Sequence, residues 1–198
     1  MKRSIGFFFM AVAAVLLFAA QGQATLVVDQ HQDTISSEWW LNMGAFSIGQ
    51  EFTPQVANLA AVEFASALSF GDTGPGVQVN VRQGSITGTV VGQGAIASSV
   101  NGWNLIDLEQ DAWLSAGSLY VLEFISSYPN NGVNPVSNNP YSGGRFILDG
   151  DAMSNYDLSF RTYYDPAAQA PVPLPGAMWL LGSGLLGLVG VRRCGWQR

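Results

Sequence analysis

Three carboxylates stand at alternate positions in the segment Asp107-Leu-Glu-Gln-Asp111, a spacing that could support acid–base chemistry. If the segment is a β-strand, Asp107, Glu109 and Asp111 share one face, with neighbours about 6.8 Å apart. That separation is near the distance between the two carboxyl groups of glycosidases. A general acid also needs an apolar pocket that raises its pKa, and the neighbouring sequence does not supply one. The alternative is a solvated strand face, or simply the turn before Trp113.

His31 is the only histidine of the chain and lies between Asp29 and Asp33. An imidazole beside a carboxylate could serve a Ser–His–Asp triad. No serine lies in the Gly-x-Ser-x-Gly pattern of a nucleophile elbow, so the sequence gives this triad no further support. We therefore assign no catalytic residue, and a glycosidase is the activity that the sequence favours most among enzymes.

Oxygen ligands of the kind that calcium prefers are concentrated between Asp149 and Asp157. The calcium candidates are Asp149, Asp151, Asn155 and Asp157. The segment departs from the EF-hand pattern, because Met153 occupies a ligand position, Ser154 the position of the glycine and Phe160 that of the closing glutamate. The alternative is an acidic hairpin loop between two strands. Calcium is the one cofactor that the sequence raises.

Aromatic side chains are numerous, with six tryptophans and six tyrosines in the chain. Exposed rings near loops can stack on the faces of sugar rings, while asparagine side chains hydrogen-bond to the hydroxyl groups. The candidate sugar contacts are Trp39, Trp40, Tyr128 and Tyr141. Large aromatics usually pack in a core, and we expect this of Trp103 and Trp113, which stand near strand ends.

The elements that would position these residues are β-strands. Val77, Val79 and Val81 alternate with polar residues, which is the period of a half-buried strand. We expect further strands at Ala45–Phe52, Leu59–Leu68, Thr89–Ala97, Trp103–Leu108, Tyr120–Ile125, Arg145–Leu148 and Leu158–Tyr163. Turn residues separate them, and Pro129–Gly144 is expected to be the longest loop. The pattern predicts an all-β fold, a single antiparallel β-sandwich of jelly-roll type.

Charge is distributed unevenly along the chain. Five of the eight basic residues lie at the two ends, and all fourteen acids lie between Asp29 and Asp165. Residues 25–165 therefore hold three arginines, no lysine and fourteen acids, a formal charge of −11. Such a surface repels nucleic acid, which we exclude as a partner. The single cysteine, Cys194, lies outside this segment, so the segment has no thiol for a disulfide or a zinc–thiolate site.

The N-terminus has the pattern of a secretory signal peptide. Lys2 and Arg3 precede the apolar segment Phe7–Ala20, and small residues follow at Gly22 and Ala24. We predict cleavage after Ala24, with an uncleaved N-terminal anchor as the alternative.

The C-terminal segment combines a proline-rich motif, an apolar run and a basic end. The motif consists of Val172, Pro173, Leu174 and Pro175. The uncharged run Gly176–Val191 follows, and a helix over it would span about 24 Å, less than the ~30 Å apolar core of a bilayer. Arg192 and Arg193 then act as a stop-transfer signal and place the end of the chain in the cytoplasm. The alternative is a plain single-pass tail anchor.

This order and spacing resemble the PEP-CTERM protein-sorting domain, over about 22 of the 198 residues. The resemblance implies a bacterial sorting signal that is read by exosortase, a membrane protease-transpeptidase of Gram-negative bacteria that make exopolysaccharide. Leu174 stands where the family has its glutamate. This departure makes cleavage at the motif less secure than the resemblance to the family.

Together these features predict five segments: a signal peptide helix at 1–24, an exported β-domain at 25–165, a linker with the sorting motif at 166–175, a transmembrane helix at 176–191 and a cytoplasmic tail at 192–198. We expect an exported bacterial cell-surface or extracellular-matrix protein, non-enzymatic and associated with exopolysaccharide. It would be anchored in the membrane before processing and reside at the cell surface or outside the cell afterwards. Its partners would be the membrane, an exosortase-like enzyme and polysaccharide. The alternative is a carbohydrate-binding module or a glycoside hydrolase of jelly-roll type.

Overall fold

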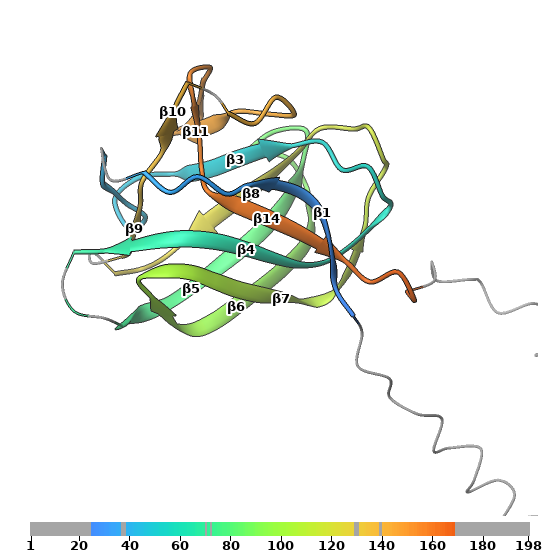
Figure 1. The fold of residues 1–198 in the computed structure, drawn as a ribbon, viewed down its shortest axis with the longest axis horizontal. Helices are drawn as coiled ribbons and strands as arrows, with labels where there is room; N and C mark the ends of the chain where they lie inside the picture. Colours follow the sequence, from blue (N-terminus) through green and yellow to red (C-terminus); the bar gives the residue numbers. More distant parts are fainter. Residues whose placement is uncertain are drawn as a thin grey trace, which may run out of the picture. The chain divides into compact units, whose positions relative to one another are not determined.

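The computed structural model describes residues 25–36, 39–69, 71, 73–128, 131–138 and 140–168 (Figure 1). These residues form strands and turns, which confirms the predicted all-β fold. Within them, no helix is long and apolar enough to cross a bilayer. The chain divides into two units, Met1–Ala167 and Ala168–Arg198, and the described strands all belong to the first. The predicted signal peptide, sorting motif, transmembrane helix and basic tail lie outside the described residues.

The described strands vary widely in length. They are β1 (Val27–Gln32), β2 (Leu41–Asn42), β3 (Ile48–Phe52), β4 (Asn58–Leu68), β5 (Thr73–Gln83), β6 (Val90–Val100), β7 (Gly102–Trp113), β8 (Tyr120–Ile125), β9 (Asn131–Val133), β10 (Val136–Ser137), β11 (Phe146–Leu148), β12 (Asp151–Met153), β13 (Tyr156–Asp157) and β14 (Phe160–Tyr164). The four long strands β4 to β7 have 11 or 12 residues each and form the middle of the sheet.

One large antiparallel sheet dominates the fold. Its main path runs β1-β14-β4-β7-β6-β5-β8-β3-β11-β12, while β9 pairs with both β2 and β4. Strands β10 and β13 form a separate two-stranded sheet. Phe64 on β4 lies 4.9 Å from Phe124 on β8 between ring centroids, although β7, β6 and β5 stand between these strands in the path. The sheet is therefore curled around its own inner face, as Figure 1 shows.

The inner face of the curled sheet carries the hydrophobic core. Val77, Val79 and Val81 on β5 are at most 1% exposed, as their alternation predicts. Phe160 and Thr162, two positions apart on β14, are fully buried in the same way. Removing apolar surface from water contributes about 25 cal/mol per Å². The alternation of side chains therefore decides which face of each strand turns inward.

A glycine permits the close contact between β6 and β7, which lie between β4 and β5 in the strand order of the sheet. Gly94 is paired with Leu108 across these strands. A Cβ atom at Gly94 would collide with the backbone oxygen of Asp107. A larger residue at this position would force the two strands apart, because the obstacle is backbone and cannot rotate away.

The structure corrects two expectations about the elements. The predicted strand Tyr120–Ile125 matches β8, but β7 continues five residues beyond the predicted end at Leu108. The expected long loop Pro129–Gly144 is wrong, because its described part contains β9 and β10. Both pair with strands distant in sequence, so the local turn composition gave no sign of them. The jelly-roll sandwich stays a prediction.

Candidate functional site

Three aromatic residues, Trp39, Trp40 and Tyr156, are called the aromatic cluster here. Trp39 stacks on Tyr156 of β13, and the next residue, Trp40, lies against Gly132 of β9. The rings of Trp39 and Tyr156 are stacked, with centroids 4.8 Å apart and planes inclined by 25°. Trp39 is nevertheless 43% exposed, and Tyr156 is half-buried on β13. Tyr156 therefore supports one side of the indole while much of Trp39 remains accessible to a ligand.

Trp40 is held in place from two sides. Its indole Nε1 donates a hydrogen bond of 2.7 Å to the backbone oxygen of Ala67 on β4. The same indole lies against Gly132 on β9, where a Cβ atom would collide with it. Trp40 is still 41% exposed. The cluster therefore presents two exposed tryptophans whose orientations are fixed by the fold.

Asn131 anchors β9, the strand against which the indole of Trp40 packs. Its side chain is fully buried, and its Nδ2 donates to the backbone oxygen of Pro75 at 2.8 Å and to Ser126 Oγ at 3.0 Å. Its Oδ1 accepts a hydrogen bond of 2.9 Å from Ser99 Oγ. These contacts join β9 to β5, β6 and the end of β8. The aromatic cluster therefore rests on a rigid polar support.

The other two candidate sugar contacts have different surroundings. Tyr128 is exposed, in the loop after β8. Tyr141 is buried, packs edge-on against Phe160 and donates from its hydroxyl to Gln30 Oε1 at 3.0 Å. It lines a hollow of about 410 Å³ together with Gln30, Thr53 and other uncharged residues. Burial raises the pKa of Tyr141, so the hydroxyl stays protonated. Its ring face is not available for stacking on a sugar.

The expectation that Trp103 and Trp113 belong to the core is wrong. Trp113 is 37% exposed, and Trp103 is half-buried beneath the guanidinium of Arg161, 4.2 Å from the ring centroid. Both occupy odd-numbered positions of β7, whereas the buried Ile106 and Leu108 occupy even-numbered ones. The period of the strand turns both tryptophans outward.

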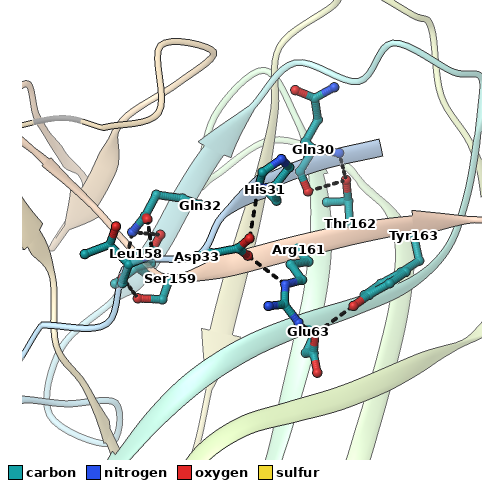
Figure 2. A network of polar contacts seen from close by, with 11 residues as sticks. Gln30, His31, Gln32, Asp33, Glu63, Leu158, Ser159, Arg161, Thr162 and Tyr163 are labelled. Atoms are coloured by element: carbon teal, nitrogen blue, oxygen red, sulfur yellow. Dashed lines mark hydrogen bonds and ion pairs between the residues drawn. The ribbon is translucent and has the colours of Figure 1, made fainter. Parts of the chain in front are cut away.

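His31 belongs to an ionic network on β1, β14 and β4 (Figure 2). Its Nδ1 lies 3.2 Å from Asp33 Oδ2, and Arg161 contacts Asp33 at 2.7 Å and Glu63 at 2.8 Å. Tyr163 completes the network by donating from its hydroxyl to Glu63 at 2.7 Å. The hydrogen bond to Asp33 raises the pKa of Arg161, which stays charged. His31 is mostly exposed and its carboxylate partner is shared with an arginine, which does not support a catalytic triad.

The three carboxylates of β7 are all exposed, while Ile106, Leu108 and Ala112 between and beside them are buried. Glu109 accepts a hydrogen bond of 3.0 Å from Gln93 Nε2, and Asp111 accepts one of 2.7 Å from Asn58 Nδ2. Glu109 and Asp111 line a hollow of about 290 Å³ with Val90 to Gln93. Because the acids are exposed to water, they lack the apolar enclosure that a general acid needs. The geometry favours the solvated face over the glycosidase.

The calcium candidates do not converge. Asp157 is fully buried, and its carboxylate accepts hydrogen bonds from Gln50 Nε2 and from the backbone N–H of Tyr141. Asp149 lies in the β11–β12 turn with φ 52° and accepts a hydrogen bond from the N–H of Ser47, while Asp151 and Asn155 are exposed. In the part of the chain that the structure describes, no three acidic, histidine or cysteine side chains are grouped to hold a metal ion. Calcium stays a prediction that this geometry does not support.

Tyr156 is the member of the aromatic cluster that the sequence candidates omit. It lies in the acidic segment Asp149–Asp157, whose composition predicts calcium ligands and not a sugar contact. Only the pairing of β13 with β10, Tyr156 against Ser137, sets its ring beside Trp39.

The sequence matches no family model, and comparisons with the curated proteins and with the solved structures found no significant similarity.

Proposed function

We propose that this chain is an exported, non-enzymatic cell-surface or matrix protein that associates with polysaccharide through the aromatic cluster. The observation that carries the proposal is the stack of Trp39 on Tyr156, which leaves Trp39 43% exposed next to Trp40, which is 41% exposed. Exposed apolar surface that is contiguous is typical of ligand-binding sites, whereas a single exposed ring is ordinary. The C–H faces of sugar rings pack well against such rings, and the loss of side-chain entropy is small because the rings are already fixed.

Amide groups near the cluster support the same ligand class. Asn138 is exposed at the end of β10, and Asn134 follows β9 with its Nδ2 bonded to the backbone oxygen of Ser36. An amide group offers both donors and acceptors to hydroxyl groups. The combination of apolar ring faces and neutral hydrogen-bonding groups is suited to a sugar chain.

The jelly-roll sandwich and the export of the protein are also part of the proposal. The contact of Phe64 with Phe124 across the curled sheet is what a two-layer jelly-roll sandwich requires. Export rests on the signal peptide pattern and on the resemblance of Val172–Arg193 to the PEP-CTERM domain, with the membrane and an exosortase-like enzyme as partners. Intact-mass measurement of the protein from membrane, surface and medium fractions tests both cleavage sites. A full-length mass in every fraction would contradict processing.

A tryptophan series tests polysaccharide association. The full chain, purified in a polyoxyethylene detergent that contains no sugar, is assayed by affinity electrophoresis against a panel of soluble polysaccharides. Trp39→Ala and Trp40→Ala should each weaken binding about tenfold or more, since loss of a well-packed anchor costs over about 1.4 kcal/mol. Trp113→Ala is the matched control, because Trp113 is similarly exposed but lies on β7 away from β13 and β9.

The control variant should bind as the wild type does. Circular dichroism and thermal unfolding of each variant show whether the fold is retained. Equal loss in all three variants, or no binding by the wild type to any polymer of the panel, would contradict the proposal.

A further inference from the structure

We infer that the aromatic cluster takes an uncharged glycan and rejects glycans that carry carboxylate, sulfate or phosphate groups. This inference rests on the proposed function and adds the chemical class of the ligand. It follows from where the few cations of the domain lie and from what they already bind.

Each arginine of the described residues is engaged by a glutamate. Arg82 contacts Glu123 at 2.7 Å, Arg145 contacts Glu51 at 2.9 Å and Arg161 contacts Glu63 at 2.8 Å. Residues 25–165 contain no lysine, so no ammonium group can take the place of these guanidinium groups. An anionic sugar bound through a cation would have to share a guanidinium whose charge a glutamate already compensates.

The glutamates in these pairs are more buried than a surface ion pair would be. Glu51 is a buried residue that accepts from Arg145 through both oxygens, at 2.9 and 3.2 Å. Glu123 and Glu63 have side chains that are 15% and 16% exposed. If an arginine side chain turned from its glutamate to an anionic ligand, the largely buried glutamate carboxylate would lose its partner. That loss is strongly unfavourable. The charge of each of these three arginines is therefore already compensated within the fold.

The strands around the cluster carry almost no charge. β2, β9, β10 and β13 contain one residue of the Asp, Glu, Lys, Arg or His type, Asp157, which has no exposed surface. Residues 25–165 as a whole have a formal charge of −11. A polyanion would thus meet repulsion at long range and find no compensating cation at the cluster. A neutral chain meets neither obstacle.

Divalent ions offer the one route by which an acidic glycan could still bind. Exposed carboxylates such as Glu109 and Asp111 could share a calcium ion with an acidic sugar. No group of three suitable side chains exists in the described part of the domain. We therefore expect added calcium not to restore binding of acidic polymers.

A matched pair of polymers tests the inference. Hydroxyethylcellulose and carboxymethylcellulose share a backbone and carry substituents of similar bulk, but only the second is anionic. Hydroxyethyl dextran and carboxymethyl dextran form a second pair. The full chain in polyoxyethylene detergent is assayed against both pairs by affinity electrophoresis at low and high salt, with calcium or with a chelator.

The expected result is binding of at least one neutral polymer, unaffected by salt, and at least tenfold weaker binding of its carboxymethylated counterpart at low salt. Trp39→Ala should weaken the binding of the neutral polymer about tenfold or more. Equal or tighter binding of the carboxymethylated polymer, with or without calcium, would overturn the inference and leave the proposed association intact. Binding of no polymer in either pair or in the wider panel would overturn both.

Discussion

Gln50 donates from Nε2 to Asp157 Oδ1 over 2.9 Å, and neither side chain has any exposed surface. The second carboxylate oxygen accepts a hydrogen bond of 2.9 Å from the backbone N–H of Tyr141. Gln50 Oε1 in turn accepts a hydrogen bond of 2.6 Å from the N–H of Leu158. Burial raises the pKa of Asp157 to about 6, although both hydrogen bonds oppose the shift. The pair ties β3 to β13 beside the aromatic cluster through contacts whose strength depends on pH.

The contribution of Asp157 to stability should fall as the pH rises from about 4 to about 7. Its pKa is 3.8 as an ordinary aspartate and about 6 in the folded domain. Between these values the folded state holds a proton that the unfolded chain has released. The stabilisation is therefore fully present below the lower value and is lost as the pH passes the higher one, a change on the order of 3 kcal/mol. Urea unfolding across this range measures it.

Asp157→Asn provides the reference for that measurement. The amide side chain of the variant does not titrate. Its NH₂ group would face one of the two donors, Gln50 Nε2 or the backbone N–H of Tyr141, so the variant is less stable than the wild type at every pH. The free energy of unfolding of the wild type relative to the variant should shrink by about 2 to 3 kcal/mol from acid to neutral pH. A difference that stays constant or grows would contradict the raised pKa.

Asn131→Asp should destabilise the domain by about 2 to 4 kcal/mol. The change is nearly isosteric, but it replaces the two donors of Nδ2 with an oxygen that faces the carbonyl of Pro75. Asn138→Asp is the matched control, because Asn138 is exposed and its φ of 72° is a conformation that aspartate also adopts. Thermal unfolding of both variants checks the prediction. Similar midpoints for the two would show that the buried network contributes little.

Arg161→Met should cost about 2 kcal/mol, because it leaves Glu63 without its cation and uncovers Trp103. Asp33→Asn should cost less than about 1 kcal/mol, since Asp33 lies on the exposed side of the same network. Denaturant unfolding gives both values. Equal costs for the two variants would mean that Asp33, and not Glu63, is the main partner of Arg161.

A stop codon after Asp165 should yield an exported protein that fractionates as soluble material, since the predicted anchor at 176–191 is removed. The full chain expressed in the same host is the comparison. Immunoblots of membrane and soluble fractions measure the distribution. A truncated chain that remains with the membrane would refute a single C-terminal anchor and point to an uncleaved N-terminal one.

Local pattern was enough to predict the strands that face the core. The alternation of Val77, Val79 and Val81 predicted their burial, because one face of a strand must turn inward. The same rule, applied to β7, would have turned Trp113 outward with Asp107 and Glu109. Strand period, and not residue type, decides which way Trp113 faces.

Asp157 could not have been predicted from its surroundings in the sequence. Acids in a turn-rich segment usually face water, and its partner Gln50 lies 107 residues away. The stack of Trp39 on Tyr156 likewise depends on which distant strands pair. Long-range pairing thus determined the parts of the candidate site that the sequence left unassigned.

The first and last strands of the described sheet are neighbours, with Val27 of β1 paired to Tyr164 of β14. The polypeptide therefore enters and leaves the domain at one place. Tension applied between the two ends would peel β1 from β14 one hydrogen-bonded pair at a time, which needs little force. Tension applied at Tyr164 against a polymer held at Trp39 would instead pull β14 lengthwise between β1 and β4, so that many pairs must break together. A protein attached by its C-terminal side is thus loaded in its mechanically stronger direction.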